Sequence, residues 1–170
     1  KNNDKIDNQP TVLLLHGFPE LSFSWRKIMP ILANEGFRVI APDMRGYGLT
    51  SGGVKKYNVD ISEYRLLNLT TDILSLLSAL KINKIDLLVG HDAGSSVAGI
   101  SALIRPDIFK SVVMMSAPFT GAPNVESNLS YEDPIHKNLE NLNPPRKHYQ
   151  WYYSTPGANN DMHLDKKGLH

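Results

Sequence analysis

The sequence predicts an α/β protein in which a mostly parallel sheet is flanked by helices. Four short runs of β-branched and aliphatic residues have the length and composition of strands that are buried on both faces. Stretches with helical periodicity separate these runs, and strands that alternate with helices at this spacing favour a parallel sheet. The four predicted strands cover residues 11–15, 37–41, 85–89 and 111–115.

Three helices are predicted between the strands, and residues 49–66 have the composition of a loop. The first helix, residues 24–35, ends before Gly36, and Pro30 within it predicts a helix in two parts. Residues 68–80 form the clearest helix because one apolar stripe runs along it. Residues 93–104 are rich in small side chains, which suit close packing of a helix on strands. The stripe of the second helix consists of Leu69, Ile73, Leu76, Leu77 and Leu80.

The composition narrows the classes of function. The 170 residues are 41% hydrophobic and 21% charged, which suits a globular core and excludes intrinsic disorder. A net charge of +1 without a concentrated basic stretch argues against nucleic-acid binding, and the lack of cysteine excludes thiolate metal sites and cysteine nucleophiles. No apolar run approaches the roughly 20 residues of a membrane span. We therefore expect a soluble protein, cytoplasmic by default, that does not bind nucleic acid.

The third predicted strand is followed by an aspartate between two glycines. Residues 90–94 have the form Gly-x-nucleophile-x-Gly on a strand-to-helix turn, with Asp92 at the centre. Such a turn is strained and exposes the central side chain over the sheet, while the N–H groups of the next helix can stabilise an anion. An aspartate in that place can attack carbon and form an ester. The alternative is that Asp92 only caps the helix that begins at Ala93.

A second motif, His16-Gly17-Phe18-Pro19, follows the first predicted strand. Because ligands bind at the carboxyl ends of the strands in such sheets, both motifs lie where a site is expected. A loop here can supply one N–H of an oxyanion hole, and the residue after the nucleophile supplies the other. Alone, the motif is equally compatible with a tight turn. The two motifs together, in this order, predict enzymatic ancestry.

Residues 11–118 resemble the first half of an α/β-hydrolase, in the branch of epoxide hydrolases and haloalkane dehalogenases. The matching pieces are residues 16–20, 24–48, 90–95 and 114–119.

This resemblance implies that Asp92 is the nucleophile and that the backbone N–H groups of Phe18 and Ala93 form the oxyanion hole, with a cis bond before Pro19. It implies two parts, the N-terminal part of the hydrolase core at residues 1–118 and the beginning of a helical cap domain at residues 119–170.

Residues 148–157 resemble the Tyr-Gln-aromatic-aromatic…Pro-Gly stretch of epoxide hydrolase caps. The resemblance places Tyr149 on the tyrosine that hydrogen-bonds the epoxide oxygen, where a phenol can donate a proton to the alkoxide. Pro19, Trp151 and Tyr152 are further candidates for contact with the substrate. The alternative, which we favour for Trp151 and Tyr153, is that these rings pack the cap onto the core.

The resemblance implies a small-molecule substrate, an epoxide or a related electrophile. It also implies two half-reactions and no metal or organic cofactor. Asp92 opens the epoxide to form an ester, and a water activated by a histidine–carboxylate pair then releases the diol. A haloalkane dehalogenase-like hydrolase is an alternative, although dehalogenases of this branch usually carry tryptophan where this sequence has Ala93. A truncated, non-catalytic relative of these hydrolases is a second alternative.

The histidine base and its acid have no candidate in the sequence. The family's chain order places both after the nucleophile, and none of the six histidines fits. Glu126 and Asp133 follow the fourth predicted strand, but their placement is that of surface residues. We therefore expect these residues to be part of a longer hydrolase, and to be poorly soluble and inactive towards epoxides when expressed alone.

Overall fold

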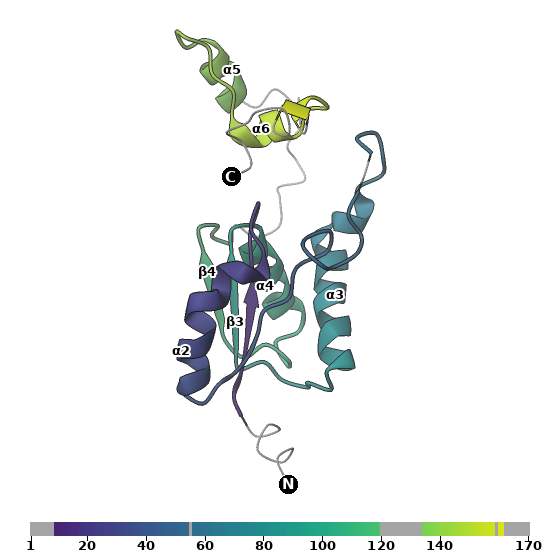
Figure 1. Cartoon of the computed structure of the whole chain (residues 1–170), viewed down its shortest axis with the longest axis vertical. Coiled ribbons are helices and arrows are strands. Elements are labelled where there is room, and N and C mark those ends of the chain that lie inside the picture. Colours follow the sequence, from purple (N-terminus) through teal and green to yellow (C-terminus); the bar gives the residue numbers. More distant parts are fainter. Residues whose placement is uncertain (1–8, 55, 120–133, 159, 162–170) are drawn as a thin grey trace. The chain divides into compact units, whose positions relative to one another are not determined.

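The structure is a computed structural model that describes residues 9–54, 56–119, 134–158 and 160–161. The chain divides into two compact units, Lys1–Gly121 and Ala122–His170, and each is described by itself (Figure 1). None of the helices in the described ranges is long and apolar enough to cross a membrane.

The first unit is built on a parallel sheet, as the sequence predicts. Its strands are β1 (Thr11–Leu15), β2 (Arg38–Ile40), β3 (Leu87–His91) and β4 (Val112–Met115), in the order β2-β1-β3-β4. Leu13 of β1 pairs with Ile40 on one side and with Leu88 on the other. All five side chains of β1 are buried, which explains its uninterrupted apolar sequence.

Helices cover both faces of this sheet (Figure 1). The 3₁₀ helix η1 (Ser22–Lys27) and α2 (Ile28–Asn34) pack against Val12 and Leu14 on one face. On the other face, α3 (Leu66–Ala79) and α4 (Ala93–Ile104) pack against Leu13 and Leu15. A second 3₁₀ helix, η2 (Ser62–Tyr64), precedes α3 within the predicted loop.

The predicted break in the first helix is confirmed, because η1 gives way to α2 at Ile28. Pro30 is the third residue of α2, where an N–H would have no intrahelical partner, so proline costs no hydrogen bond. Leu80 is 39% exposed, contrary to its place in the predicted stripe, because α3 ends at Ala79. The third strand lies two residues later than predicted, and Ile85 forms only an isolated bridge to Phe109.

In the second unit the described residues form α5 (Pro134–Glu140) and α6 (Tyr149–Tyr153). Ala158 is buried in this unit, whereas most of its described side chains are exposed. No strand occurs in its described part, in agreement with the sequence. Glu126 and Asp133, which the sequence assigned to the surface, lie outside the described residues.

Candidate active site

Asp92 lies between the end of β3 and the start of α4, in a strained backbone conformation. Its φ is 53° and its ψ is −119°, a region that non-glycine residues occupy rarely and at an energetic cost. The side chain makes no capping hydrogen bond to α4, so the interpretation of Asp92 as a simple helix cap is wrong. Instead, its Oδ1 accepts a hydrogen bond from the backbone N–H of Phe18 at 2.9 Å. The strain therefore directs the carboxylate towards the turn after β1.

Two small residues hold the turn at Asp92 in place. A Cβ on Gly94 would overlap the carbonyl of Leu15 and lie 2.6 Å from that of His16, so only glycine lets α4 approach β1 this closely. Ser95 is fully buried, and its Oγ lies 2.7 Å from the carbonyl oxygens of Gly90 and Met115. The same Oγ accepts the N–H of Met115 at 3.0 Å. These contacts fasten the start of α4 to the ends of β3 and β4.

The turn after β1 approaches Asp92 through Gly17. A Cβ on Gly17 would lie 2.8 Å from the carbonyl oxygen of His91 and 2.9 Å from Asp92 Oδ1, so the close approach requires glycine. The peptide bond between Phe18 and Pro19 is cis, as the resemblance implies. The structure therefore brings together Asp92, Phe18 and Ala93, with Pro19 next to the N–H donor of Phe18. Ala93 is the first residue of α4, and an N–H at this position has no intrahelical partner.

His16 is a buried structural residue rather than a base. Its Nε2 accepts the backbone N–H of Met44 at 2.9 Å, which places the ring proton on Nδ1, 2.9 Å from the carbonyl oxygen of Gly17. Both ring nitrogens are therefore engaged, and the bond at Nε2 joins the end of β1 to the loop after β2. Tyr47 packs edge-on against the ring, with the centroids 4.9 Å apart. Burial raises the pKa of the Tyr47 phenol, and the negative charge of Asp92 adds to this shift.

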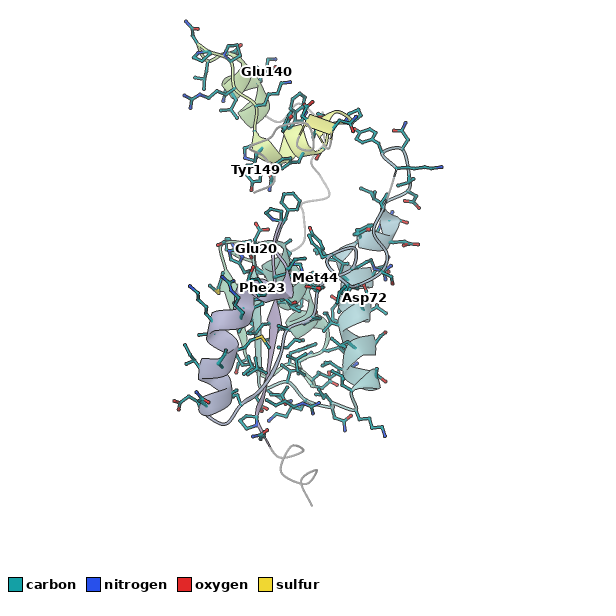
Figure 2. All side chains as sticks on the ribbon, viewed as in Figure 1. Glu20, Phe23, Met44, Asp72, Glu140 and Tyr149 are labelled. Atoms are coloured by element: carbon teal, nitrogen blue, oxygen red, sulfur yellow. The ribbon has the colours of Figure 1, made fainter. Side chains whose placement is uncertain are left out.

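Glu20 and His91 form a pair that the sequence analysis did not identify. His91 Nδ1 lies 2.9 Å from Glu20 Oε2, and both side chains are about one-third exposed. Figure 2 shows Glu20 at the end of the sheet where β1 ends. The signal was present in the sequence, because Glu20 directly follows the motif after β1, and His91, the last residue of the neighbouring strand β3, directly precedes Asp92. The pair gives the two turns a second connection beside the hydrogen bond from Phe18.

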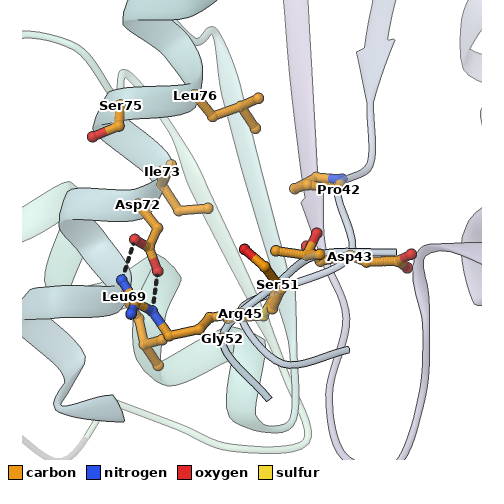
Figure 3. Close-up of a pocket in the computed structure, with 12 residues that line it drawn as sticks. Pro42, Asp43, Arg45, Ser51, Gly52, Leu69, Asp72, Ile73, Ser75 and Leu76 are labelled. Carbon is orange, nitrogen blue, oxygen red and sulfur yellow. Dashed lines mark hydrogen bonds and ion pairs between the residues drawn. The ribbon is translucent and has the colours of Figure 1, made fainter. Parts of the chain in front are cut away.

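Among the described residues, two cavities lie near the loop after β2. The cavity of about 270 Å³ is lined by Gly17, which lies close to Asp92, and by Ala93, which follows Asp92 in the chain. The other, of about 290 Å³, lies between this loop and α3 (Figure 3) and contains none of the predicted site residues. Arg45 contributes to both walls, and two hydrogen bonds of 2.6 and 2.7 Å join its guanidinium to Asp72. The bonds to Asp72 raise the pKa of Arg45.

The remaining predicted residues lie on α6 in the second unit. Tyr149 is half-exposed, and its ring packs edge-on against Tyr153 with a centroid distance of 6.2 Å. The Tyr152 hydroxyl donates to Asp161 Oδ2 at 2.6 Å, and this bond raises the pKa of Tyr152. The Lys147 ammonium lies over the ring of Trp151, with its nitrogen 5.0 Å from the ring centroid. In the described part of the chain, no group of three or more histidine, aspartate or glutamate side chains could hold a metal ion.

Comparison with known proteins points to one family. Residues 10–155 match the model of the alpha/beta hydrolase fold. The chain is 49% identical over 110 residues to an epoxide hydrolase of Caballeronia sordidicola, covering 65% of this chain and 32% of that protein. It is 37% identical over 163 residues to epoxide hydrolase B of Mycobacterium tuberculosis, covering 94% of this chain and 44% of that protein. The chain thus spans less than half the length of these two curated relatives.

A solved structure also resembles this chain. An epoxide hydrolase from an endophytic Streptomyces matches with a TM-score of 0.72 at 33% identity, covering 92% of this chain and 44% of that one.

Proposed function

Because the chain belongs to the alpha/beta hydrolase fold family, we propose that the whole protein hydrolyses epoxides to diols through an ester formed on Asp92. The observation that carries this proposal is the orientation of Asp92. A carboxylate at a helix N-terminus would ordinarily cap the helix, yet this one is turned towards the N–H of Phe18 on a strained backbone. The similarity to epoxide hydrolases supports the choice of substrate.

In the first half-reaction, Asp92 acts as the nucleophile. Oδ1 is held by the Phe18 N–H, so Oδ2 attacks an epoxide carbon and Oδ1 becomes the carbonyl oxygen of the ester. The ring C–O bond breaks, and its electron pair stays on the departing oxygen. We assign the proton for this oxygen to the phenol of Tyr149, on the strength of the resemblance of residues 148–157 to epoxide hydrolase caps. The product of this step is a hydroxyalkyl ester of Asp92.

In the second half-reaction, water attacks the carbonyl carbon of the ester and releases the diol. The negative charge then develops on Oδ1, within reach of the Phe18 N–H and at the positive end of α4. The N–H groups of Phe18 and Ala93 thus form the proposed oxyanion hole. A histidine base takes one proton of this water and gives it to the diol oxygen that departs from Asp92, and the proton that stays on the carboxyl group restores the Tyr149 phenol. We expect this histidine outside the 170 residues, because His16 uses both ring nitrogens for structure.

The proposal is tested by trapping the ester in the whole protein. Styrene oxide is mixed with enzyme, the reaction is quenched within one turnover, and peptides are mapped by mass spectrometry. We expect the adduct on Asp92, its loss in Asp92→Asn, and its retention in Asp107→Asn, a surface aspartate paired with Arg105. In isotopically labelled water, the first turnover should give unlabelled diol, because the oxygen comes from Asp92. An adduct on another residue, or labelled diol in the first turnover, contradicts the proposal.

A further inference from the structure

The strained backbone of Asp92 persists only if the surrounding structure holds it. With a φ of 53° and a ψ of −119°, the residue lies in a region that is costly for any residue with a side chain. The glycines of the two turns leave room for this conformation, but a glycine has no side chain that could hold it. The holding contacts must therefore come from hydrogen bonds to the peptide groups that flank Asp92.

Both flanking peptide groups of Asp92 are hydrogen-bonded. The N–H of Asp92 donates to the carbonyl oxygen of Met115, the last residue of β4, at 2.9 Å. The carbonyl oxygen of Asp92 accepts the N–H of Ser95 at 2.9 Å. Because φ and ψ are the rotations between these two peptide groups, the directions of the two bonds set the backbone conformation of Asp92. That conformation therefore depends on how Met115 and Ser95 are placed relative to each other.

The side chain of Ser95 fixes this relative placement. Its Oγ accepts the N–H of Met115 at 3.0 Å and lies 2.7 Å from the carbonyl oxygen of the same residue. It also lies 2.7 Å from the carbonyl oxygen of Gly90 on β3. A serine hydroxyl has one proton, so this proton is shared between the two carbonyl oxygens. Ser95, Met115 and Asp92 thus form a closed ring of hydrogen bonds.

This ring lies where the sheet stops supporting the turn. The pair of His91 and Met115 is the last pair in the register of β3 and β4, and Ser116 after it has a φ of 68°. Ser95 is fully buried, so water does not compete for its hydrogen bonds, and the loss of a buried hydrogen bond is costly. The hydroxyl of Ser95 therefore joins the two strands at their end, directly beside the nucleophile.

We propose that Ser95 is a positioning residue for the nucleophile. Through Met115, its hydroxyl holds the backbone of Asp92 in the strained conformation that directs the carboxylate towards the N–H of Phe18. The inference rests on the proposed function and adds a residue that acts on the reaction without contact with the substrate. Without the hydroxyl, the two peptide groups can rotate towards an unstrained conformation, and the carboxylate then moves away from the Phe18 N–H.

The first test is the pre-steady-state kinetics of Ser95→Ala in the whole protein with styrene oxide. A displacement of about 1 Å at a reacting group can lower a rate by about 10²-fold, so a partial relaxation of Asp92 should slow ester formation at saturating epoxide by about tenfold or more. The epoxide concentration that gives the half-maximal rate should change by less than about threefold, because the buried Ser95 does not contact the substrate.

Ser101→Ala is the matched control. Ser101 is also fully buried on α4, and its hydroxyl donates to Thr70 Oγ1 at 3.2 Å, away from the turn at Asp92. The substitution removes the same buried hydroxyl group and should leave the rate of ester formation unaltered. An unaltered rate in Ser95→Ala, or an equal fall in Ser101→Ala, overturns the inference. If Ser95→Ala does not fold, Ser95→Cys carries the same test, because a thiol is a weaker donor and acceptor.

A spectroscopic measurement separates this inference from the proposed chemistry. In the whole protein with ¹⁵N-labelled phenylalanine, the amide proton of Phe18 reports its hydrogen bond to Asp92. Its NMR signal should move upfield in Ser95→Ala and stay in place in Ser101→Ala. If the protein forms no ester but the signal moves in this way, the proposed function fails and the role of Ser95 stands. If the ester forms but neither its rate nor the signal depends on Ser95, the positioning role alone is refuted.

Discussion

Replacing Gly17 with alanine should damage catalysis as well as stability. Gly17 brings the turn after β1 against Asp92, and the Cβ of alanine would overlap the Cβ of Asp92 and lie 2.8 Å from the carbonyl oxygen of His91. Ordinary van der Waals contact begins at 3.4 Å. The two turns must therefore separate by about one ångström, an overpacking that costs about 1–3 kcal/mol of unfolding free energy.

The separation acts on the hydrogen bond between Phe18 N and Asp92 Oδ1. This bond is 2.9 Å long, and an increase of about one ångström takes it beyond the usual range of N–H···O bonds. Loss of one oxyanion donor lowers kcat by about 10² to 10³. We expect a loss of this size in ester hydrolysis, because negative charge develops on Oδ1 in that step, and a smaller change in ester formation, in which charge leaves the carboxylate.

Pre-steady-state kinetics of the whole protein with styrene oxide measures the two steps, and thermal unfolding measures the stability. Gly36→Ala is the matched control: φ is +90° there and no atom lies within 4 Å of the new Cβ, so alanine costs about 1–2 kcal/mol of backbone strain. It should lower stability by a similar amount and leave both rate constants unchanged. A Gly17→Ala protein that keeps its rate constant for ester hydrolysis within threefold of the wild type refutes the reasoning.

Two further predictions concern stability. Leu77 is almost completely buried, so Leu77→Ala should lower the unfolding free energy by about 2–5 kcal/mol in urea titrations. Leu67 is exposed on the same helix, so Leu67→Ala should lower it by at most about 0.5 kcal/mol. Similar losses in both variants would contradict the described core. The N–H of Ser22, followed by that of Leu49, lowers the pKa of Asp43 in the folded state. The resulting stabilisation is present above the unfolded pKa of about 3.9 and is lost as pH falls through the folded pKa. Asp43→Asn should therefore be less stable than the wild type at pH 6, and the difference in unfolding free energy should shrink below about pH 4. A difference that does not change with pH would exclude this linkage.

The sheet and the main helices could be predicted because each carries a local signal. The apolar run at residues 11–15 appears unchanged as β1, and the small-residue stretch at 93–104 appears unchanged as α4. The boundaries that shifted depend on pairing between distant strands. β3 reaches His91 because that residue pairs with Met115 of β4, and the sequence near His91 contains no sign of this partner.

The candidate site was predicted where the motif itself fixes the geometry. The glycines around Asp92 are a requirement of the backbone and have a clear sequence signature, whereas the cis bond at Pro19 was expected only from the family resemblance. The pair of Glu20 and His91 was missed because the two residues are 71 positions apart and meet only through the adjacency of β1 and β3. The cavity beside Ala93 is likewise a property of packing between α3, α4 and a loop.

The adjacency of β1 and β3 also has a consequence for how the molecule folds. The hydrogen bond from Phe18 to Asp92 joins residues 74 positions apart, and β2 and α3 must be synthesised between them. Parallel pairing over such a separation carries a large loop-closure entropy and is a slow step in folding. The nucleophile thus acquires its N–H partner only when the centre of the sheet has closed. The onset of reactivity at Asp92 during refolding should therefore report on that closure rather than on the formation of the individual helices.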